Sequence, residues 1–347
     1  MRVGNRAHRT FWETDVKRMT LYAQLIAALW LLVLGALPMA VRADDSRGFV
    51  FFGDSLTDPG NHYIAFGQVT RPPYQPVPIY PYAIGGHHFS NGATWAEDLT
   101  DELDTPVSGK PALRQPGIFT NYAVGRARAR PGAPVFPDFD LGTQVGAFLT
   151  DFGGHAPANR TYVIWIGAND LFDALEALQL DQTGATSLGI IQQAIGATAE
   201  SVQMLWASGA REFLVLNLAD PALTPYVRSL GPVAQGASTQ LTAAYNGALA
   251  QVLASLGALP QIQIRQFDIN AFLHSVVSSP ARYGLRDVQD SCLSFGMVTN
   301  AVCADPDRYL FWDGIHPTRA GHLLISFALL KASVVANVEE RETELTR

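Results

Sequence analysis

Four short apolar runs in the chain are continuous rather than alternating, and segments of helical length separate them. Continuous apolar runs are typical of parallel strands that are buried on both faces of a sheet. The predicted strands are Gly48–Phe52, Tyr162–Ile166, Phe213–Leu218 and, with weaker β character, Ile262–Phe267. A further strand is expected near Ile118–Ala123.

Between and after these runs, apolar residues recur at helical spacing. The expected helices are Thr94–Leu103, Ser187–Ala207, Gly236–Leu256 and Thr318–Val338. Strands that alternate with helices indicate an α/β protein with a parallel sheet covered on both faces. Two proline-rich stretches, residues 68–89 and 130–140, interrupt this pattern and are expected to be long loops, which either cover the surface or build a substrate pocket.

The N-terminal segment has the organisation of a secretory signal. The uncharged stretch Leu21–Leu37 follows Lys17 and Arg18, and small residues precede a cleavage site expected after Ala43. We therefore predict a signal peptide over residues 1–43 and an exported protein, periplasmic or secreted. An uncleaved membrane anchor is the alternative, because the apolar stretch approaches the length that spans a bilayer; translation from Met19 is a further possibility.

The composition indicates a globular protein, since 48% of the 347 residues are hydrophobic and only 16% are charged. This length allows one or two domains. Residues 1–43 contain six basic and two acidic side chains, so the rest of the chain is more acidic than the net charge of −7 suggests. An acidic chain of this kind argues against a nucleic-acid partner and against long-range attraction to an anionic membrane.

The two cysteines, Cys292 and Cys303, both lie in the part of the chain that would be exported. In an oxidising compartment we expect them to form one disulfide that closes a local loop, with two unrelated buried thiols as the alternative. Neither cysteine lies in a CxxC motif, so the sequence gives little support to zinc or redox chemistry.

Three segments could place reactive side chains at the carboxyl edge of the predicted sheet. Ser55 follows the first strand and could be a nucleophile, although Asp-Ser is also common turn and cap chemistry. Asn169 follows the second long apolar run and could donate to an oxyanion or cap the next helix. Asp313 and His316 precede the last helix, and a carboxylate three residues from an imidazole can orient it as a base. The N–H of Gly125 could be another oxyanion donor, although glycine also serves tight turns.

These segments together resemble the GDSL, or SGNH, hydrolase family, in particular its secreted phospholipase and hemolysin-like branch. They read FFGDSLTDPGN, NYAVGRA, IGAND and DGIHPT, and FSNGATW and NLADPALTP also resemble segments of the larger secreted members. The resemblance covers about residues 48–335. It implies a three-layer, flavodoxin-like α/β/α fold with a central parallel sheet, formed as one hydrolase domain over residues 44–347.

The resemblance also implies a role for each residue. Ser55 would be the nucleophile, His316 the base and Asp313 its orienting carboxylate, with an oxyanion hole formed by the amides of Ser55 and Gly125 and the side chain of Asn169. The chain departs from the family where Arg126 follows Gly125, because many relatives have a second glycine there. Arg126 would supply the amide if that position carries the donor.

Arg126, Arg128 and Arg130 lie close together in an otherwise acidic chain. We expect them to frame the pocket and to meet a phosphate or carboxylate of the substrate, with a solvated loop as the alternative. The expected activity is hydrolysis of acyl esters, such as lysophospholipids or short-chain esters, without a cofactor or metal and with transient contact with a lipid surface. The sequence leaves the oligomeric state open.

One other family and two other functions compete with this prediction. An α/β-hydrolase would need a G-x-S-x-G elbow, which is absent at Ser55. A metallophosphoesterase is suggested by Gly53-Asp54 and Gly60-Asn61-His62, but these fragments lie too close together to form separate corners of a metal site. A carbohydrate- or surface-binding module with a vestigial site would leave the Ser, Asn, Asp and His set unexplained.

Overall fold

The computed structural model describes residues 48–67, 88–132, 139–294, 297 and 299–345. The predicted signal peptide and most of the two proline-rich loops lie outside these residues. Residues Arg47–Arg347 form one compact unit. In the described part, no helix is both long enough and apolar enough to cross a membrane.

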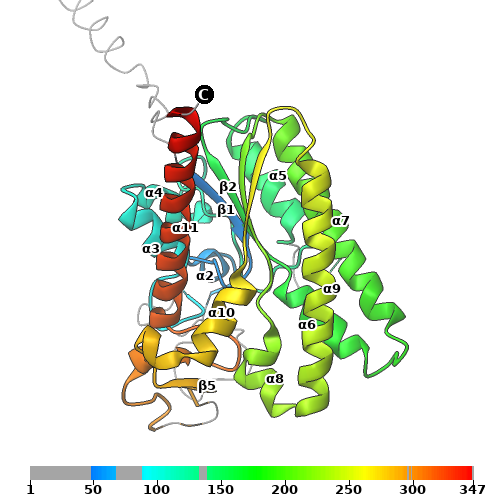
Figure 1. Cartoon of the computed structure of the whole chain (residues 1–347), viewed down its shortest axis with the longest axis vertical. Helices are drawn as coiled ribbons and strands as arrows, with labels where there is room; N and C mark the ends of the chain where they lie inside the picture. The colour runs from blue at the N-terminus through cyan, green and yellow to red at the C-terminus, as the bar shows by residue number, and fades with distance from the viewer. Residues whose placement is uncertain (1–47, 68–87, 133–138, 295–296, 298, 346–347) are drawn as a thin grey trace, which may run out of the picture. The chain divides into compact units, whose positions relative to one another are not determined.

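A four-stranded parallel sheet forms the centre of the molecule (Figure 1). Its strands pair in the order β1, β2, β3, β4 and begin and end within two residues of the predicted runs. Their bounds are Phe49–Gly53, Thr161–Trp165, Glu212–Leu216 and Gln263–Phe267. The first two strands are in register from Phe49 opposite Thr161 to Gly53 opposite Trp165. Their carboxyl ends therefore lie side by side.

The predicted strand near Ile118–Ala123 is wrong as an element of secondary structure. The chain does run parallel to β1, because the Phe51 N–H donates to the Thr120 carbonyl and the Tyr122 N–H donates to the Phe51 carbonyl. Only Asn121 forms a bridge with β1, however, and the same residue also bridges to Pro111. The segment adds an irregular edge beside β1, on the side away from β2, which is the flavodoxin-like order.

Helices cover both faces of the sheet, as predicted (Figure 1). One layer contains α3 and α11, which pack against each other, and the other contains α5, α6, α7 and α9. These helices span Trp95–Glu102, Arg319–Leu345, Leu141–Asp151, Ala168–Ala177, Ala185–Ala207 and Pro232–Leu256. The result is the predicted three-layer α/β/α arrangement.

The remaining elements are short and lie largely in the connections. They are α2 (Asn61–Phe66), α4 (Pro106–Gly109), α8 (Pro225–Ser229), α10 (Ile269–Ser278), β5 (Asp287–Ser291), β6 (Tyr309–Phe311) and the 3-10 turns η1 (Ala112–Arg114), η2 (Pro221–Leu223), η3 (Pro280–Tyr283) and η4 (Pro306–Arg308). Two of the helices begin at residues that favour a helix start. Thr94 and Glu97 form a capping box for α3, and Pro232 begins α9, where its missing N–H costs nothing.

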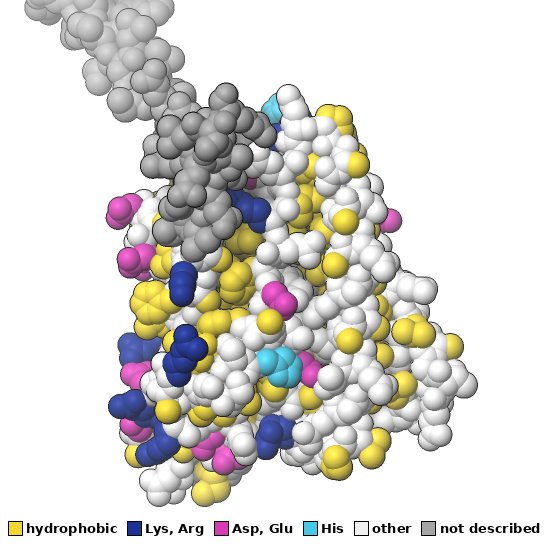
Figure 2. Space-filling model, viewed as in Figure 1, with side chains coloured by type: hydrophobic (Ala, Val, Ile, Leu, Met, Phe, Trp, Pro, Cys, Tyr) yellow, Lys and Arg dark blue, Asp and Glu magenta, His cyan; other side chains and the backbone are white. Residues whose placement is uncertain are grey.

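Basic side chains gather at the lower left of the face drawn in Figure 2, with acidic side chains among them. Opposite charges also pair at exposed positions of this protein, where Arg319 binds Asp307 at 2.6 Å and Arg308 lies 3.9 Å from Asp305. This face therefore has no uninterrupted basic surface of the kind that follows a nucleic-acid backbone.

Candidate active site

The serine segment follows the carboxyl end of β1. Gly53 ends this strand against β2 so closely that a Cβ there would lie 2.6 Å from the Trp165 carbonyl oxygen. The Gly53 N–H donates to Gln144 Oε1, and Asp54 Oδ1 accepts the Leu56 N–H. These bonds form a tight turn that presents Ser55 at the edge of the sheet, with 9% of its surface exposed.

Ser55, His316 and Asp313 form a continuous chain of hydrogen bonds. His316 Nε2 lies 2.8 Å from Ser55 Oγ, and His316 Nδ1 lies 2.7 Å from Asp313 Oδ2. All three side chains are buried. Because the carboxylate accepts the Nδ1 proton, Nε2 is left as the acceptor for the serine hydroxyl proton. The fold thus joins two segments that are 261 positions apart.

The turn that carries Asp313 and His316 is held by its own backbone. Asp313 Oδ1 accepts the N–H groups of Ile315 and His316, each at 2.8 Å, and the Trp312 N–H donates to the His316 carbonyl. Ser90, in the segment before α3, adds a bond, since its hydroxyl donates to the Pro317 carbonyl. This bonding fixes the carboxylate and the ring relative to each other.

Asn169 lies in the first turn of α6 rather than at its cap. The cap position belongs to Gly167, whose φ of 118° favours glycine and whose missing side chain leaves room for the Tyr245 hydroxyl. Asn169 Nδ2 donates one hydrogen to the Ala127 carbonyl at 2.9 Å. An amide carries two such hydrogens, so the bond orients the side chain and leaves one hydrogen for a ligand beside Ser55.

The N–H of Gly125, which was expected to donate to an oxyanion, has a partner within the protein. This N–H donates to buried Asp58 Oδ2 at 2.7 Å, so it is already engaged. A Cβ at Gly125 would lie only 2.2 Å from the Phe89 ring. The glycine therefore makes room for Phe89, whose ring centroid lies 5.2 Å from that of His316.

Asp58 was not among the predicted site residues, although it belongs to the first motif. Its carboxylate accepts four backbone N–H groups, those of Gly60, Asn61, His62 and Gly125. Burial raises the pKa of Asp58 to about 6, and the four N–H donors oppose that rise. Asp58 thereby ties the turn after Ser55 to the loop that contains Arg126.

The three arginines after Gly125 do not act alike, which corrects the expectation that all of them frame the pocket. Arg128 binds both carboxylate oxygens of Asp173, at 2.6 and 2.7 Å, and this pairing raises its pKa. Arg130 also binds Asp173 and lies 3.3 Å from Asp170. Arg130 is therefore an ion-pairing residue that anchors the loop to α6, whereas Arg126 and Arg128 line the pocket beside Ser55.

Arg126 has an unusual backbone. Its φ of 71° lies in the left-handed region, which costs a side-chain-bearing residue about 1 kcal/mol or more. Burial, followed by the neighbouring charge of Arg128, lowers the pKa of the Arg126 side chain. The chain therefore keeps a strained, partly desolvated cation beside the candidate nucleophile.

The fragments that suggested a metallophosphoesterase have other roles in the structure. Asn61 donates to the carbonyls of Asn121 and Ala123 and accepts the Leu113 N–H, so it joins the connections around β1. Among the described residues, no group of three or more His, Cys, Asp or Glu side chains is placed to hold a metal ion.

Cys292 and Cys303 form the predicted disulfide, with Cα atoms 4.9 Å apart. With Leu293, Ala301 and Trp312 they form a small separate apolar cluster. The Cys292 and Leu293 N–H groups donate to the carbonyls of Phe311 and Trp312. The disulfide loop therefore braces the chain directly before Asp313.

The chain is similar to known proteins over most of its length. The sequence profile described as GDSL-like Lipase/Acylhydrolase matches residues 49–329. The chain belongs to this family. It is accordingly a hydrolase that acts on ester bonds.

Among its relatives is a GDSL esterase/lipase of Arabidopsis thaliana, 28% identical, with 79% of this chain and 82% of the relative covered. A phosphatidylcholine-sterol acyltransferase of Aeromonas hydrophila is 26% identical, with 85% and 93% covered. The thermolabile hemolysin of Vibrio parahaemolyticus is 23% identical, with 85% and 65% covered. An acetyl xylan esterase of Geobacillus stearothermophilus superposes with a TM-score of 0.43 at 13% identity, over 82% of this chain and 94% of that one.

Proposed function

We propose that this protein is an exported serine esterase that hydrolyses carboxylic esters through a covalent acyl-enzyme on Ser55. The observation that carries the proposal is the buried chain of hydrogen bonds from Asp313 through His316 to Ser55 Oγ. A serine hydroxyl is a weak nucleophile unless an adjacent base removes its proton, and His316 Nε2 is placed to do so.

In the acylation step, Ser55 Oγ attacks the ester carbonyl carbon while His316 Nε2 takes the hydroxyl proton. Asp313 stabilises the imidazolium that forms and does not itself become protonated. The carbon–oxygen bond to the alcohol then breaks, and His316 returns the proton to the departing alcohol oxygen. The acyl group remains attached to Ser55.

In the deacylation step, His316 takes a proton from water and the hydroxide attacks the acyl carbonyl carbon. The bond to Ser55 Oγ breaks, the serine regains its proton from His316, and the carboxylic acid leaves. Both steps pass through an oxyanion, for which we assign three donors: the N–H groups of Ser55 and Arg126 and the second Nδ2 hydrogen of Asn169. Arg126 takes the place expected of Gly125, whose N–H is bonded to Asp58.

Replacing Ser55 by Ala tests the mechanism. We expect the variant to fold normally and to lose at least about 10³-fold in kcat on p-nitrophenyl acetate. A serine-directed phosphonate should inactivate the wild type with one adduct, which peptide mass spectrometry should locate on Ser55. Ser229→Ala is the matched control, because Ser229 lines the same pocket and its hydroxyl donates to the Tyr226 carbonyl.

Two outcomes would contradict the proposal and point to the competing functions. Retained turnover in Ser55→Ala, together with loss of activity on chelation, would indicate metal-assisted hydrolysis. A folded wild type that is inactive towards every acyl ester tested, but binds a carbohydrate, would indicate a binding module.

A further inference from the structure

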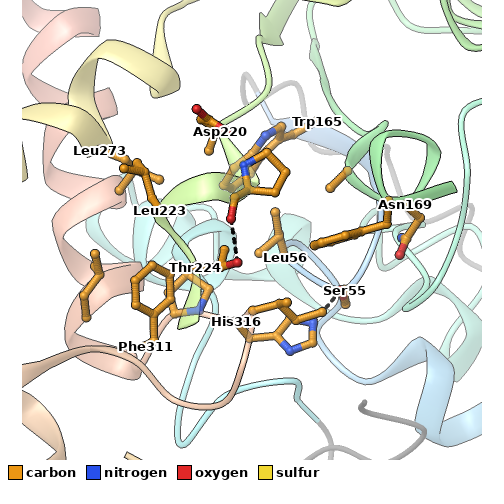
Figure 3. A pocket seen from close by; sticks show the side chains of 17 residues that line it. Ser55, Leu56, Trp165, Asn169, Asp220, Leu223, Thr224, Leu273, Phe311 and His316 are labelled. Carbon is orange, nitrogen blue, oxygen red and sulfur yellow. Dashed lines mark hydrogen bonds between the residues drawn. The ribbon is translucent and has the colours of Figure 1, made fainter. Parts of the chain in front are cut away.

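Two hollows of different size and character meet at Ser55 and His316. The first is a cavity of about 70 Å³, and Figure 3 shows the side chains that surround it. We call it the acyl slot and define it by Leu56, Trp165, Leu223, Leu273 and Phe311. The second is a hollow of about 510 Å³, which we call the alcohol basin and define by Phe89, Arg126, Arg128, Tyr226 and Leu230. Both hollows are lined by Ser55, Asn169, Phe172, Ile315 and His316.

We propose that the acyl slot binds the acyl chain and limits it to about four to six carbons, while the alcohol basin receives the larger alcohol part of the ester. This inference rests on the proposed function, because it concerns the acyl and alcohol parts of the ester, which the attack of Ser55 separates. An acyl slot of this size favours short-chain acyl esters as substrates over lysophospholipids with long acyl chains.

Asp220 and Thr224, two polar side chains at the wall of the acyl slot, are already bonded within the protein, and the Trp165 indole N–H, which has no hydrogen-bond partner among the described residues, is itself buried. The Asp220 carboxylate accepts hydrogen bonds from the Ala222 N–H and from the hydroxyls of Ser238 and Thr239. The Thr224 hydroxyl donates to the Pro221 carbonyl at 2.6 Å, a bond drawn dashed in Figure 3. An alcohol with several polar or charged groups would lose more bonds to water in the slot than the slot could replace, whereas an alkyl chain loses none.

The size of the acyl slot sets the length of that chain. A water-sized group needs roughly 10–15 Å³ of such a cavity, so the slot holds about five of them. Each methylene group that enters should raise kcat/KM by up to about fourfold, and further groups have no room. In Figure 3, Leu273, Leu223 and Phe311 lie on the side of the slot away from Ser55. Leu273 comes from α10 and Phe311 from β6, so these packed elements close the slot.

The alcohol basin differs in its polar character. Arg128 lies there in its ion pair with Asp173, and Arg126 adds a second guanidinium beside Ser55. Its apolar surface includes Phe172 and Tyr226, whose ring centroids are 6.0 Å apart. This combination and its volume suit a large polar alcohol, including one that carries an anionic group.

Two series of substrates separate the roles of the hollows. One series varies the acyl chain of p-nitrophenyl esters from two to twelve carbons, and the other varies the alcohol of butanoyl esters. For the wild type we expect kcat/KM to peak at four to six carbons and to fall at least about tenfold by ten carbons. Alcohols of increasing size should change kcat/KM by far less.

Variants of the slot should move this optimum. Leu273→Ala enlarges the slot and should shift the optimum to longer acyl chains by two or more carbons, and Leu223→Phe should shift it to shorter ones. Val276→Ala is the matched control, because Val276 is fully buried on the same helix and does not line the slot. It should leave the optimum unchanged even where it lowers stability, since a ratio of substrates does not depend on the folded fraction.

Arg126→Ala tests the role of the alcohol basin. It should lower kcat/KM for a butanoyl ester whose alcohol carries a phosphate, relative to p-nitrophenyl butanoate, and leave the acyl optimum in place. The assignment is overturned if the slot variants change the dependence on the alcohol instead, or if neither of them moves the acyl optimum. Failure of the proposed function would look different, because p-nitrophenyl acetate would then be hydrolysed equally well by Ser55→Ala.

Discussion

Gly125 shows how a motif can single out a residue without showing what its N–H binds. Its motif is recognisable in the sequence, and the resemblance suggested that its N–H binds an oxyanion. The structure shows instead that this N–H binds Asp58 and that the missing side chain admits the Phe89 ring. Phe89 in turn packs against His316. No periodicity or motif spacing links residues 89 and 125, so only packing could reveal this dependence.

Asp54 makes the stability of the fold depend on pH. It is buried directly before Ser55, its Oδ2 has no hydrogen-bond partner in the described part of the chain, and burial raises its pKa to about 7. A folded-state pKa above the unfolded value means that the native state binds the proton more tightly. This contribution to stability is therefore complete below about pH 4 and is lost as the pH rises through 7.

We expect the free energy of unfolding to fall between pH 5 and pH 8, and Asp54→Asn to reduce that fall by about 2–4 kcal/mol. Urea unfolding of the wild type and the variant at several pH values measures this free energy. Buried Asp58 and Asp170, each with a pKa raised to about 6, also lower the stability as the pH rises. The Asp54→Asn variant should therefore keep part of the pH dependence. Asp290→Asn is the control, because Asp290 is exposed. An unchanged slope in Asp54→Asn would contradict this account.

At the scale of the elements, the disulfide loop supports the segment that carries Asp313 and His316. Cys292 and Leu293 donate to the carbonyls of Phe311 and Trp312, and the Trp312 N–H donates to the His316 carbonyl. The bridge closes a loop between cysteines eleven positions apart, for which a chain-entropy argument allows at most about 3 kcal/mol. We therefore expect a second role for the bridge, which is to position Asp313 and His316 through these backbone bonds.

A variant in which both cysteines are replaced by Ser tests this role. We expect the free energy of unfolding to drop by about 1–3 kcal/mol and kcat to drop at least about threefold, because the triad loses part of its positioning. Reduction with dithiothreitol should reproduce the loss of kcat in the wild type and leave the variant unaffected. A reduced wild type with undiminished kcat would show that the loop does not position the triad.

At the scale of the whole molecule, the disulfide and the N-terminal sequence both favour export. With the leader intact, expression in a bacterium should yield a processed protein outside the cytoplasm, and N-terminal sequencing should read from Asp44. Translation from Met19 predicts the same mature end. Ala43→Trp is the control, because a large residue at that position should block cleavage. A membrane-bound product with its original N-terminus would show an anchor instead.

Much of the architecture was predictable, because buried parallel strands leave continuous apolar runs and amphipathic helices leave a periodic pattern, and both depend only on local sequence. The four strands and the helices on both faces of the sheet could be recognised in this way, whereas the segments containing Ser55, Asn169, Asp313 and His316 were recognised from their place after strands or before a helix and from the resemblance of their motifs to the GDSL family. The segment near Ile118–Ala123 was harder, since its apolar residues resemble a strand but Asn121 bonds to two different segments.

The sequence by itself determined which residues carry the candidate chemistry and which fold presents them. Only the tertiary structure decided that His316 reaches Ser55 from 261 positions away, that Gly125 is bonded to Asp58, and that Arg128 and Arg130 are paired with Asp173. It also decided that a small apolar slot and a wide basin meet at the serine. The physical reason is that hydrogen-bond partners, ion pairs and cavity walls come from side chains distant in sequence, whose meeting depends on packing.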